Sequence, residues 1–243
     1  MPGPGLVALV GGDEFKPGNE EQDRMLVARA RKNAPAYVVP TAAARQGPEE
    51  AVAHAVAWFG SLGLSVQQLP VLKPADAKSR EIADAAREGG FFYLVGGDPG
   101  LVAQVLRESR VWEAITEAWL GGAALAGSSA GAMAMCEHTL IRAAWPDRSN
   151  RRPTDALGLV PGVAVLPHFE TFGHRWIESA RRELPGVTLL GIDERSAAVW
   201  KDGAWLAAGP GAVTVIAGEK TERYESGATV VGLANPDRML RSQ

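Results

Sequence analysis

The chain of 243 residues has little cysteine, little excess charge and no long apolar run. Its one cysteine, Cys136, excludes an internal disulfide framework and a thiolate-rich metal cluster. Because 25 Lys and Arg oppose 28 Asp and Glu, the formal net charge is −3, and we expect no broad basic surface for nucleic acid or an acidic membrane. The apolar stretch at residues 6–10 is too short for a signal peptide or a membrane span. We therefore expect a cytoplasmic protein that binds neither nucleic acid nor membranes.

Hydrophobic residues make up 46% of the chain and charged residues 22%, as in an ordinary globular protein. Short apolar runs alternate with longer amphipathic stretches. They predict strands at residues 6–10, 36–39, 65–69, 91–95 and 123–126, and helices at residues 20–33, 49–62, 80–87, 101–107 and 111–120. This alternation indicates an α/β fold, a three-layer sandwich with a mostly parallel central sheet.

Beyond residue 186 the pattern changes to short apolar segments separated by glycines. Strands are expected there at residues 187–192, 197–201, 204–206, 213–216 and 229–231. They predict a C-terminal antiparallel extension of the sheet, with Lys201-Asp202-Gly203 as a hairpin turn. Residues 143–153, which contain three arginines, are expected to form a polar surface loop. Because there is no internal repeat and no long linker, residues 1–243 are expected to form a single domain.

The segment Gly127-Ser128-Ser129-Ala130-Gly131 has the spacing of a nucleophile elbow, between an expected strand and a helix that continues from residue 132. A nucleophile on such a sharp turn lies on strained backbone, and small neighbours leave the hydroxyl of Ser129 accessible. The N–H groups of the following helix can hold an oxyanion. The same residues also suit a turn in which Ser129 only caps the helix, and the motif alone does not decide between these interpretations.

Other residues that could take part in catalysis also follow apolar runs. Gly96-Gly97-Asp98-Pro99 comes after residues 91–95, where backbone amides suit the second half of an oxyanion site, although these residues also make a good tight turn. Among the four histidines, His168 has the best position for a general base. The acid that would orient its imidazole has two candidate locations, Asp193-Glu194 and Asp147.

Four segments in this order and spacing resemble the S51 serine peptidases: residues 94–98, 126–132, 167–169 and 191–194. The resemblance covers about residues 6–216 and implies a fold like that of the class I glutamine amidotransferases. It implies that Ser129 is the nucleophile and His168 the base, and that the amides of Gly97 and Ala130 hold the oxyanion.

The resemblance also bears on the acid and the substrate. Glu194 is similar in position to the acid of the cyanophycinases and is favoured, whereas Asp147 lies near the position of the aspartate of dipeptidase E. Pro99 replaces a polar residue that the family usually carries, so neither aspartyl nor cyanophycin specificity is carried over. Asp98 and Pro99 are candidate substrate contacts. Three arginines downstream of the histidine are candidates to bind a substrate carboxylate, namely Arg175, Arg181 and Arg182.

We therefore expect a serine peptidase acting on short peptides through a Ser-His-Glu/Asp mechanism, as a monomer or homodimer, with neither a metal nor an organic cofactor. Two other functions stay open. One is an esterase of the α/β-hydrolase type, which would use Ser129, Asp147 and His168 in that chain order. The other is a catalytically inactive, amidotransferase-like domain that binds a small molecule.

Overall fold

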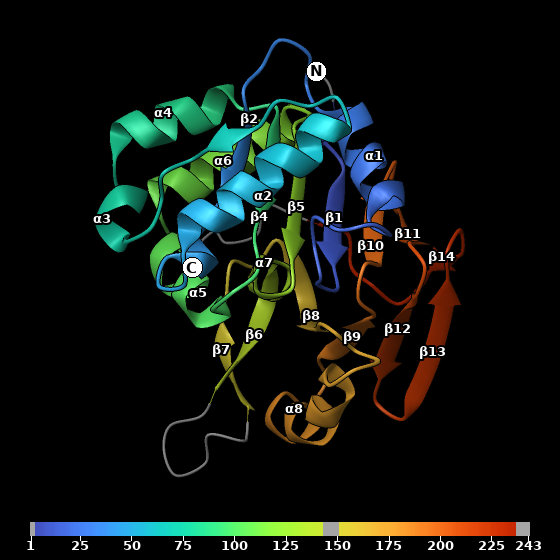
Figure 1. Ribbon diagram of the computed structural model, residues 1–243. Helices are drawn as coiled ribbons and strands as arrows, with labels where there is room; N and C mark the ends of the chain where they lie inside the picture. The colour runs from blue at the N-terminus through green and yellow to red at the C-terminus, as the bar shows by residue number, and fades with distance from the viewer. Residues whose placement is uncertain (1–2, 143–150, 237–243) are drawn as a thin grey trace.

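The computed structural model describes residues 3–142 and 151–236, in which helices surround two β-sheets (Figure 1). The strands are β1 (Val7–Val10), β2 (Ala36–Val39), β3 (Gln67–Gln68), β4 (Phe91–Leu94), β5 (Ala124–Ser128), β6 (Cys136–Arg142), β7 (Arg151–Asp155), β8 (Val160–Leu166), β9 (Thr188–Ile192), β10 (Ala197–Lys201), β11 (Ala204–Ala208), β12 (Ala212–Ala217), β13 (Lys220–Glu225) and β14 (Thr229–Val230). The α-helices are α1 (Glu20–Arg29), α2 (Pro48–Ser61), α3 (Pro74–Ala77), α4 (Arg80–Glu88), α5 (Pro99–Leu106), α6 (Arg110–Leu120), α7 (Ala130–Met135) and α8 (Ile177–Glu183), and short 3-10 helices lie at Thr41–Ala43 and Gly173–Trp176.

The first sheet has eight strands in the order β14-β11-β10-β1-β5-β4-β2-β3. Its half formed by β1, β5, β4, β2 and β3 is parallel throughout. Strands β10, β11 and β14 extend it with antiparallel pairing next to β1. The predicted parallel core and antiparallel extension are both present. Because β1, β4 and β5 run in one direction, the loops after them meet at the same edge of the sheet.

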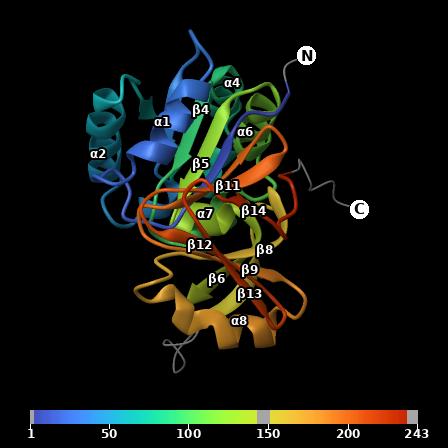
Figure 2. The ribbon, with the colours of Figure 1, turned by 90° about the vertical axis from the view of Figure 1, so that its right-hand side faces the viewer.

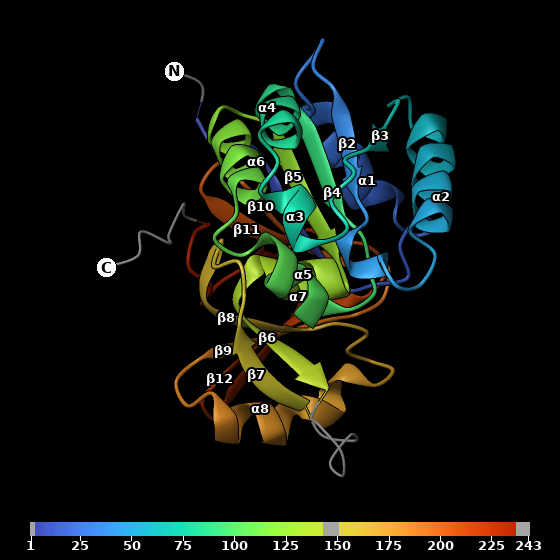
Figure 3. The same cartoon turned by 90° about the vertical axis from the view of Figure 1, so that its left-hand side faces the viewer.

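The two faces of this sheet are covered by different helices, as the side chains of β4 illustrate. Phe91 and Tyr93 pack in a cluster with Phe59 of α2 and Leu26 of α1. Phe92 joins a second cluster, on the other face, that includes side chains of α4, α5 and α6. Figures 2 and 3 show α1 and α2 on one side of the sheet and α4 and α6 on the other, which makes the three layers. Full burial of a side chain such as Phe59 stabilises the fold by about 1.5–3 kcal/mol.

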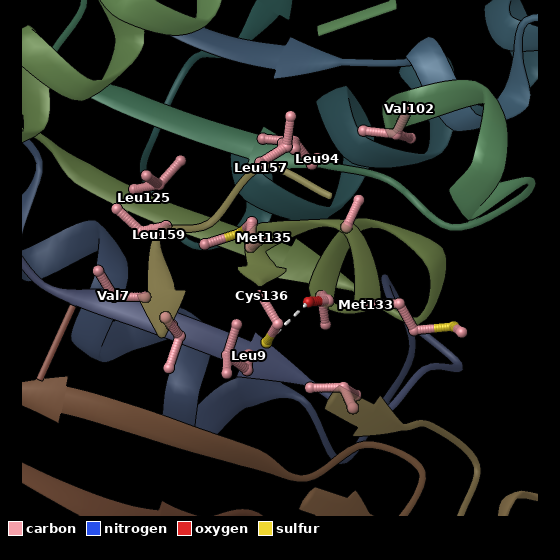
Figure 4. Close-up of a cluster of buried hydrophobic side chains, with 14 of the residues drawn as sticks. Val7, Leu9, Leu94, Val102, Leu125, Met133, Met135, Cys136, Leu157 and Leu159 are labelled. Carbon is pink, nitrogen blue, oxygen red and sulfur yellow. Dashed lines mark hydrogen bonds between the residues drawn. The ribbon is translucent and has the colours of Figure 1, made fainter. Parts of the chain in front are cut away.

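The second sheet has six strands in the order β13-β12-β9-β8-β6-β7, and Figure 1 shows it below the first sheet, with α8 beside it. Strands β6, β8 and β9 are parallel, whereas β7, β12 and β13 pair antiparallel. Helix α7 packs against both sheets, since its side chains share one core with β1, β5 and β8. All six residues of α7 are buried, and Figure 4 shows Met133, Met135 and Cys136 in this core, with the Cys136 thiol directed at a backbone carbonyl of α7.

Several segments differ from the sequence-based expectation in detail. Strands β9 and β12, expected in the extension of a single sheet, lie in a second sheet, where β9 pairs parallel with β8 and antiparallel with β12. Residues 151–153, expected in a surface loop, begin the edge strand β7, where proline and charged side chains are tolerated because one side is unpaired. Residues 143–150 lie outside the described residues. In the part of the chain that the structure describes, no helix is both long enough and apolar enough to cross a membrane.

Candidate active site

Five strand ends from the two sheets converge where the chemistry-bearing residues of the sequence lie. The ends of β1, β4 and β5 contribute Gly11-Gly12, Gly96-Gly97 and Ser128-Ser129 from the first sheet. The ends of β8 and β9 contribute His168 and Glu194 from the second sheet. The site is thus assembled between the sheets, and each sheet supplies part of it.

Ser129 stands on a strained turn between β5 and α7. Its backbone has φ 46° and ψ −108°, a combination that non-glycine residues rarely adopt. Its N–H donates to the carbonyl of Val10 at 2.9 Å, which ties the turn to the end of β1. Its side chain is partly exposed, whereas Ser128 and Ala130 on either side are buried. The hydroxyl of Ser129 therefore projects from an otherwise closed bend.

The glycines of the elbow are required by close packing. A Cβ atom on Gly127 would lie 2.6 Å from the carbonyl carbon of Gly131, and one on Gly131 would lie 2.3 Å from the carbonyl oxygen of Leu94. Both contacts are with backbone atoms, which cannot move aside as a side chain can. Helix α7 therefore approaches β4 and β5 closely only because these two positions lack side chains, as the elbow motif predicts.

His168 brings its imidazole to the Ser129 hydroxyl, with 3.1 Å between Nε2 and Oγ. The backbone N–H of His168 donates to the carbonyl of Gly11 at 2.7 Å, and the residue has a positive φ of 48°. The ring of Phe172 stacks on the imidazole with 4.8 Å between centroids and an interplanar angle of 21°. A Cβ on Gly12 would lie 2.3 Å from Cε1 and Nε2 of the same ring. Gly12, in the turn after β1, and Phe172 are therefore both close neighbours of the imidazole ring.

Glu194 completes a hydrogen-bonded chain, with 2.8 Å between its Oε1 and Nδ1 of His168. The hydroxyl of Thr171 also donates to Oε1 at 3.3 Å. In the tautomer whose Nδ1–H donates to this carboxylate, Nε2 has the lone pair that can accept the proton of Ser129. The side chains of His168 and Glu194 are 20% and 23% exposed, so the pair is partly shielded from water.

A further carboxylate supports the loop that carries Glu194. Both oxygens of Glu170 accept the N–H of Glu194, at 3.0 and 3.1 Å. Desolvation raises the pKa of Glu170, and the buried Asp193 beside it raises this pKa further, while hydrogen bonds from the backbone oppose the shift. Asp193 itself accepts from Arg223 at 2.8 Å and from the N–H of Ala212 at 3.0 Å. Of the predicted Asp193-Glu194 pair, Glu194 thus contacts the imidazole, and Asp193 anchors the loop to β12 and β13.

The two residues expected to hold an oxyanion lie in the loop after β4 and at the start of α7. Ala130 is the first residue of α7, so its N–H has no carbonyl partner within the helix. Gly97 has φ 139°, and a Cβ there would lie 2.3 Å from the carbonyl oxygen of Ala42, so only glycine fits. Next to it, the Asp98 carboxylate accepts the N–H of Leu101 at 3.2 Å and caps α5, which Pro99 begins. The side chain of Asp98 therefore stabilises the start of α5.

The arginines that are candidates to bind a substrate carboxylate lie in the segment that follows His168. Arg175 is exposed on the 3-10 helix Gly173–Trp176, and Asp147 lies outside the described residues. Arg181 donates to the carbonyl of Gly218 at 2.6 Å. His138 lies on β6, where its Nδ1 is 3.5 Å from Asp155.

Several contacts of the site do not follow from the sequence pattern alone. Gly12 and Glu14 belong to the turn after β1, and the Gly11-Gly12 pair resembles Gly96-Gly97 in following an apolar strand. That repetition was a signal that could have identified the turn. The stacking of Phe172 on His168 had no such signal. Within residues 3–142 and 151–236, no group of three or more His, Cys, Asp or Glu side chains is arranged to hold a metal ion.

Several known proteins are similar to this chain. The model of Peptidase family S51 matches residues 6–206. Cyanophycinase of Trichormus variabilis is 29% identical over 237 residues, which cover 95% of this chain and 78% of that protein. Cyanophycinase of Synechococcus elongatus is 29% identical over 221 residues, which cover 87% of this chain and 68% of that protein.

Two solved structures have a similar fold. A peptidase from an acI-B1 Actinobacterium superposes with a TM-score of 0.81 at 30% identity and covers 93% of this chain and 96% of its own. A putative peptidase E protein from Listeria monocytogenes superposes with a TM-score of 0.55 at 20% identity over 91% of this chain and 98% of its own, a likeness of fold alone. The family model matches well over half of the chain, and its match includes the elbow, His168 and Glu194. The chain belongs to peptidase family S51 and is a peptidase-type hydrolase.

Proposed function

We propose that this protein is a serine peptidase that hydrolyses short peptides through an acyl-enzyme intermediate. The observation that carries the proposal is the hydrogen-bonded chain from Ser129 through His168 to Glu194, which begins on a strained elbow. Ser129 is the nucleophile, His168 the general base and Glu194 the acid that orients the imidazole. Family membership supports peptide hydrolysis, and the three roles rest on the geometry.

The reaction has two halves. Nε2 of His168 removes the hydroxyl proton as Oγ of Ser129 attacks the peptide carbonyl, and the carboxylate of Glu194 stabilises the imidazolium that forms. The imidazolium then gives its proton to the leaving amine. In the second half, His168 activates a water that releases the acyl group and restores the serine. The N–H groups of Gly97 and Ala130 stabilise the oxyanion in both halves, and the loss of one such donor costs about a hundredfold or more in rate.

Arg151 is our candidate for binding a substrate carboxylate, in preference to Arg175. Its guanidinium carbon lies 4.4 Å from the ring centroid of Trp176. Trp176 contacts Phe172, with 5.4 Å between centroids, and Phe172 in turn stacks on the catalytic imidazole. Desolvation lowers the pKa of Arg151, as does the neighbouring charge of Arg142. A half-buried guanidinium that is stacked on an aromatic ring can bind a carboxylate through two parallel hydrogen bonds.

A fluorophosphonate labelling experiment tests the proposed nucleophile. We expect wild type to gain one label, located on Ser129 by peptide mapping, and Ser129→Ala to gain none. Ser61→Ala is the matched control because Ser61 is exposed at the end of α2, and it should label like wild type. Equal labelling of wild type and Ser129→Ala would contradict the mechanism.

A substrate profile tests the activity itself. Wild type and Ser129→Ala are compared on dipeptides, on short peptides with free or blocked termini, on cyanophycin and on p-nitrophenyl acetate. Cleavage of peptides by wild type alone supports the proposal. Hydrolysis of the ester without any peptide would favour an esterase, and a labelled serine without turnover would favour a binding domain.

A further inference from the structure

Glu14, in the turn after β1, joins two loops that are distant in the sequence. Its Oε1 accepts the N–H of Gly96 at 2.8 Å, and its Oε2 accepts the hydroxyl of Ser128 at 2.8 Å. The partners lie 82 and 114 residues away along the chain, at the ends of β4 and β5. One carboxylate thus connects the ends of two neighbouring parallel strands.

Each partner of Glu14 is the immediate neighbour of a residue in the proposed mechanism. Gly96 precedes Gly97, a proposed oxyanion donor, and Ser128 precedes the nucleophile Ser129. Ser128 is fully buried, so its hydroxyl does not compete for substrate. Glu14 therefore bridges the two residues that immediately precede Gly97 and Ser129 in the sequence.

The glycine at position 96 makes room for this bridge. Its φ is not in the positive range that favours glycine, so backbone conformation does not explain the residue. A Cβ on Gly96 would instead lie 2.9 Å from Oε1 of Glu14. The absence of a side chain at position 96 and the presence of the carboxylate at position 14 are thus complementary.

The turn that carries Glu14 also contacts the base. The carbonyl of Gly11 accepts the N–H of His168, and Gly12 packs against its imidazole. The β1 turn is therefore in contact with all three loops that supply the nucleophile, the base and the oxyanion donor. Within this turn, Glu14 is the residue whose side chain makes the connection.

We propose that Glu14 is a positioning residue for peptide hydrolysis, which sets the geometry of the oxyanion site relative to Ser129. The inference rests on the proposed function. Because Glu14 acts through Gly96 and Ser128, its loss should weaken binding of the transition state and leave binding of the ground state unchanged. The signature is a fall in kcat at constant KM.

The test measures kcat and KM for Glu14→Gln and Glu14→Ala on the best peptide found for wild type. Glu14→Ala removes both hydrogen bonds, and we expect kcat to fall about a hundredfold, the size of effect that a misplaced reacting group produces. Glu14→Gln keeps an oxygen for the Gly96 N–H, and its amide can donate to the Ser128 hydroxyl, so we expect a loss of about tenfold. KM should stay within about twofold in both variants.

Asp13→Asn is the matched control. Asp13 lies in the same turn and carries the same charge, but its carboxylate pairs with Lys16 and Arg195 instead of the two loops. This variant should keep the kcat of wild type. If Glu14→Ala keeps kcat within about twofold of wild type, or changes KM alone, the inference is wrong.

A double-mutant cycle with Gly96→Ala tests whether the effect passes through the contact. In wild type the new methyl group collides with the carboxylate, whereas in Glu14→Ala that oxygen is gone, so Gly96→Ala should cost much less there. Losses that simply multiply would overturn the inference.

Amide exchange, read by NMR without substrate, separates this inference from the proposed function. The Gly96 and Gly97 amides should exchange at least about tenfold faster in Glu14→Ala than in wild type, while amides of α2 keep their rates. Unchanged exchange would refute the positioning role even if the protein hydrolysed no peptide. Faster exchange in a protein that hydrolyses nothing would refute the proposed function and retain the structural role of the bridge.

Discussion

Substitution of Asp23 by asparagine should stabilise the protein, and by more as the pH rises. Asp23 lies on α1 and is fully buried. Trp58 donates its indole N–H to Oδ2 at 2.7 Å, whereas Oδ1 has no hydrogen-bond partner within the described residues. Desolvation is the largest cause that raises the pKa of Asp23 from 3.8 to about 7, against the opposing hydrogen bond from Trp58. The folded protein therefore has to ionise a carboxyl group in an apolar environment.

The sign and size follow from proton linkage. Because the pKa is higher in the folded state, the folded protein binds the proton more tightly, and the contribution of this group to stability is complete below pH 3.8. It is lost as the pH rises through about 7. A difference between 3.8 and about 7 corresponds to roughly 4 kcal/mol at high pH, of which roughly 2–3 kcal/mol is lost between pH 5 and pH 8.

Urea unfolding of wild type and Asp23→Asn at pH 5 and pH 8 measures this effect. The asparagine side chain keeps the acceptor for Trp58 and has no charge, so the advantage of the variant should grow by about 2–3 kcal/mol over this range, with an unchanged m value. Asp84→Asn, on the exposed face of α4, should show a pH-independent difference within about 0.5 kcal/mol. An equal advantage of Asp23→Asn at both pH values would refute the assignment of a buried, ionising carboxyl.

Three further predictions concern the site. Glu194→Gln should lower kcat by at least about a hundredfold with little change in KM, because the imidazole loses its orienting charge; fluorophosphonate labelling should slow in parallel, and unchanged labelling would exclude Glu194 as the acid. Gly12→Ala places a methyl group 2.3 Å from the imidazole at a backbone φ of +116°. We therefore expect the variant to lose turnover and to be about 1–3 kcal/mol less stable in urea titrations. Normal activity of this variant would show that the imidazole ring can move aside. Arg151→Met should raise KM about tenfold for peptides with a free carboxylate and leave amidated peptides unaffected, whereas Arg152→Met should act on neither.

The sequence predicts those elements whose own residues form a recognisable pattern of apolar runs and glycines. Strands such as β1 and β4 are short apolar runs followed by two glycines, and the elbow motif follows from the need for small residues around Ser129. The expected α/β class and S51 membership are confirmed. The pairing of Ser129, His168 and Glu194 in the structure matches the favoured assignment, and the roles of these residues stay predictions.

The missed features depend on contacts between distant segments. Strand β13, Lys220–Glu225, is rich in charge because it is an edge strand, so its composition resembles that of a loop. The parallel direction of β9 is decided by its pairing with β8 and leaves no trace in its apolar residues. Glu14 is one acidic residue in a turn, and only the approach of residues 96 and 128 distinguishes it from a solvated side chain.

The proposed nucleophile lies on one sheet and the proposed base and acid lie on the other, which has a consequence for how activity should respond to heat. Ser129 follows β5 of the eight-stranded sheet, and His168 and Glu194 follow β8 and β9 of the six-stranded sheet. The separation of 3.1 Å between Oγ and Nε2 is therefore a measure of how well these halves are docked. On mild heating, a small displacement of one sheet relative to the other would abolish the proposed hydrolysis, while the far-ultraviolet circular dichroism of both sheets stays unchanged. We therefore expect activity to be lost at a lower temperature than secondary structure.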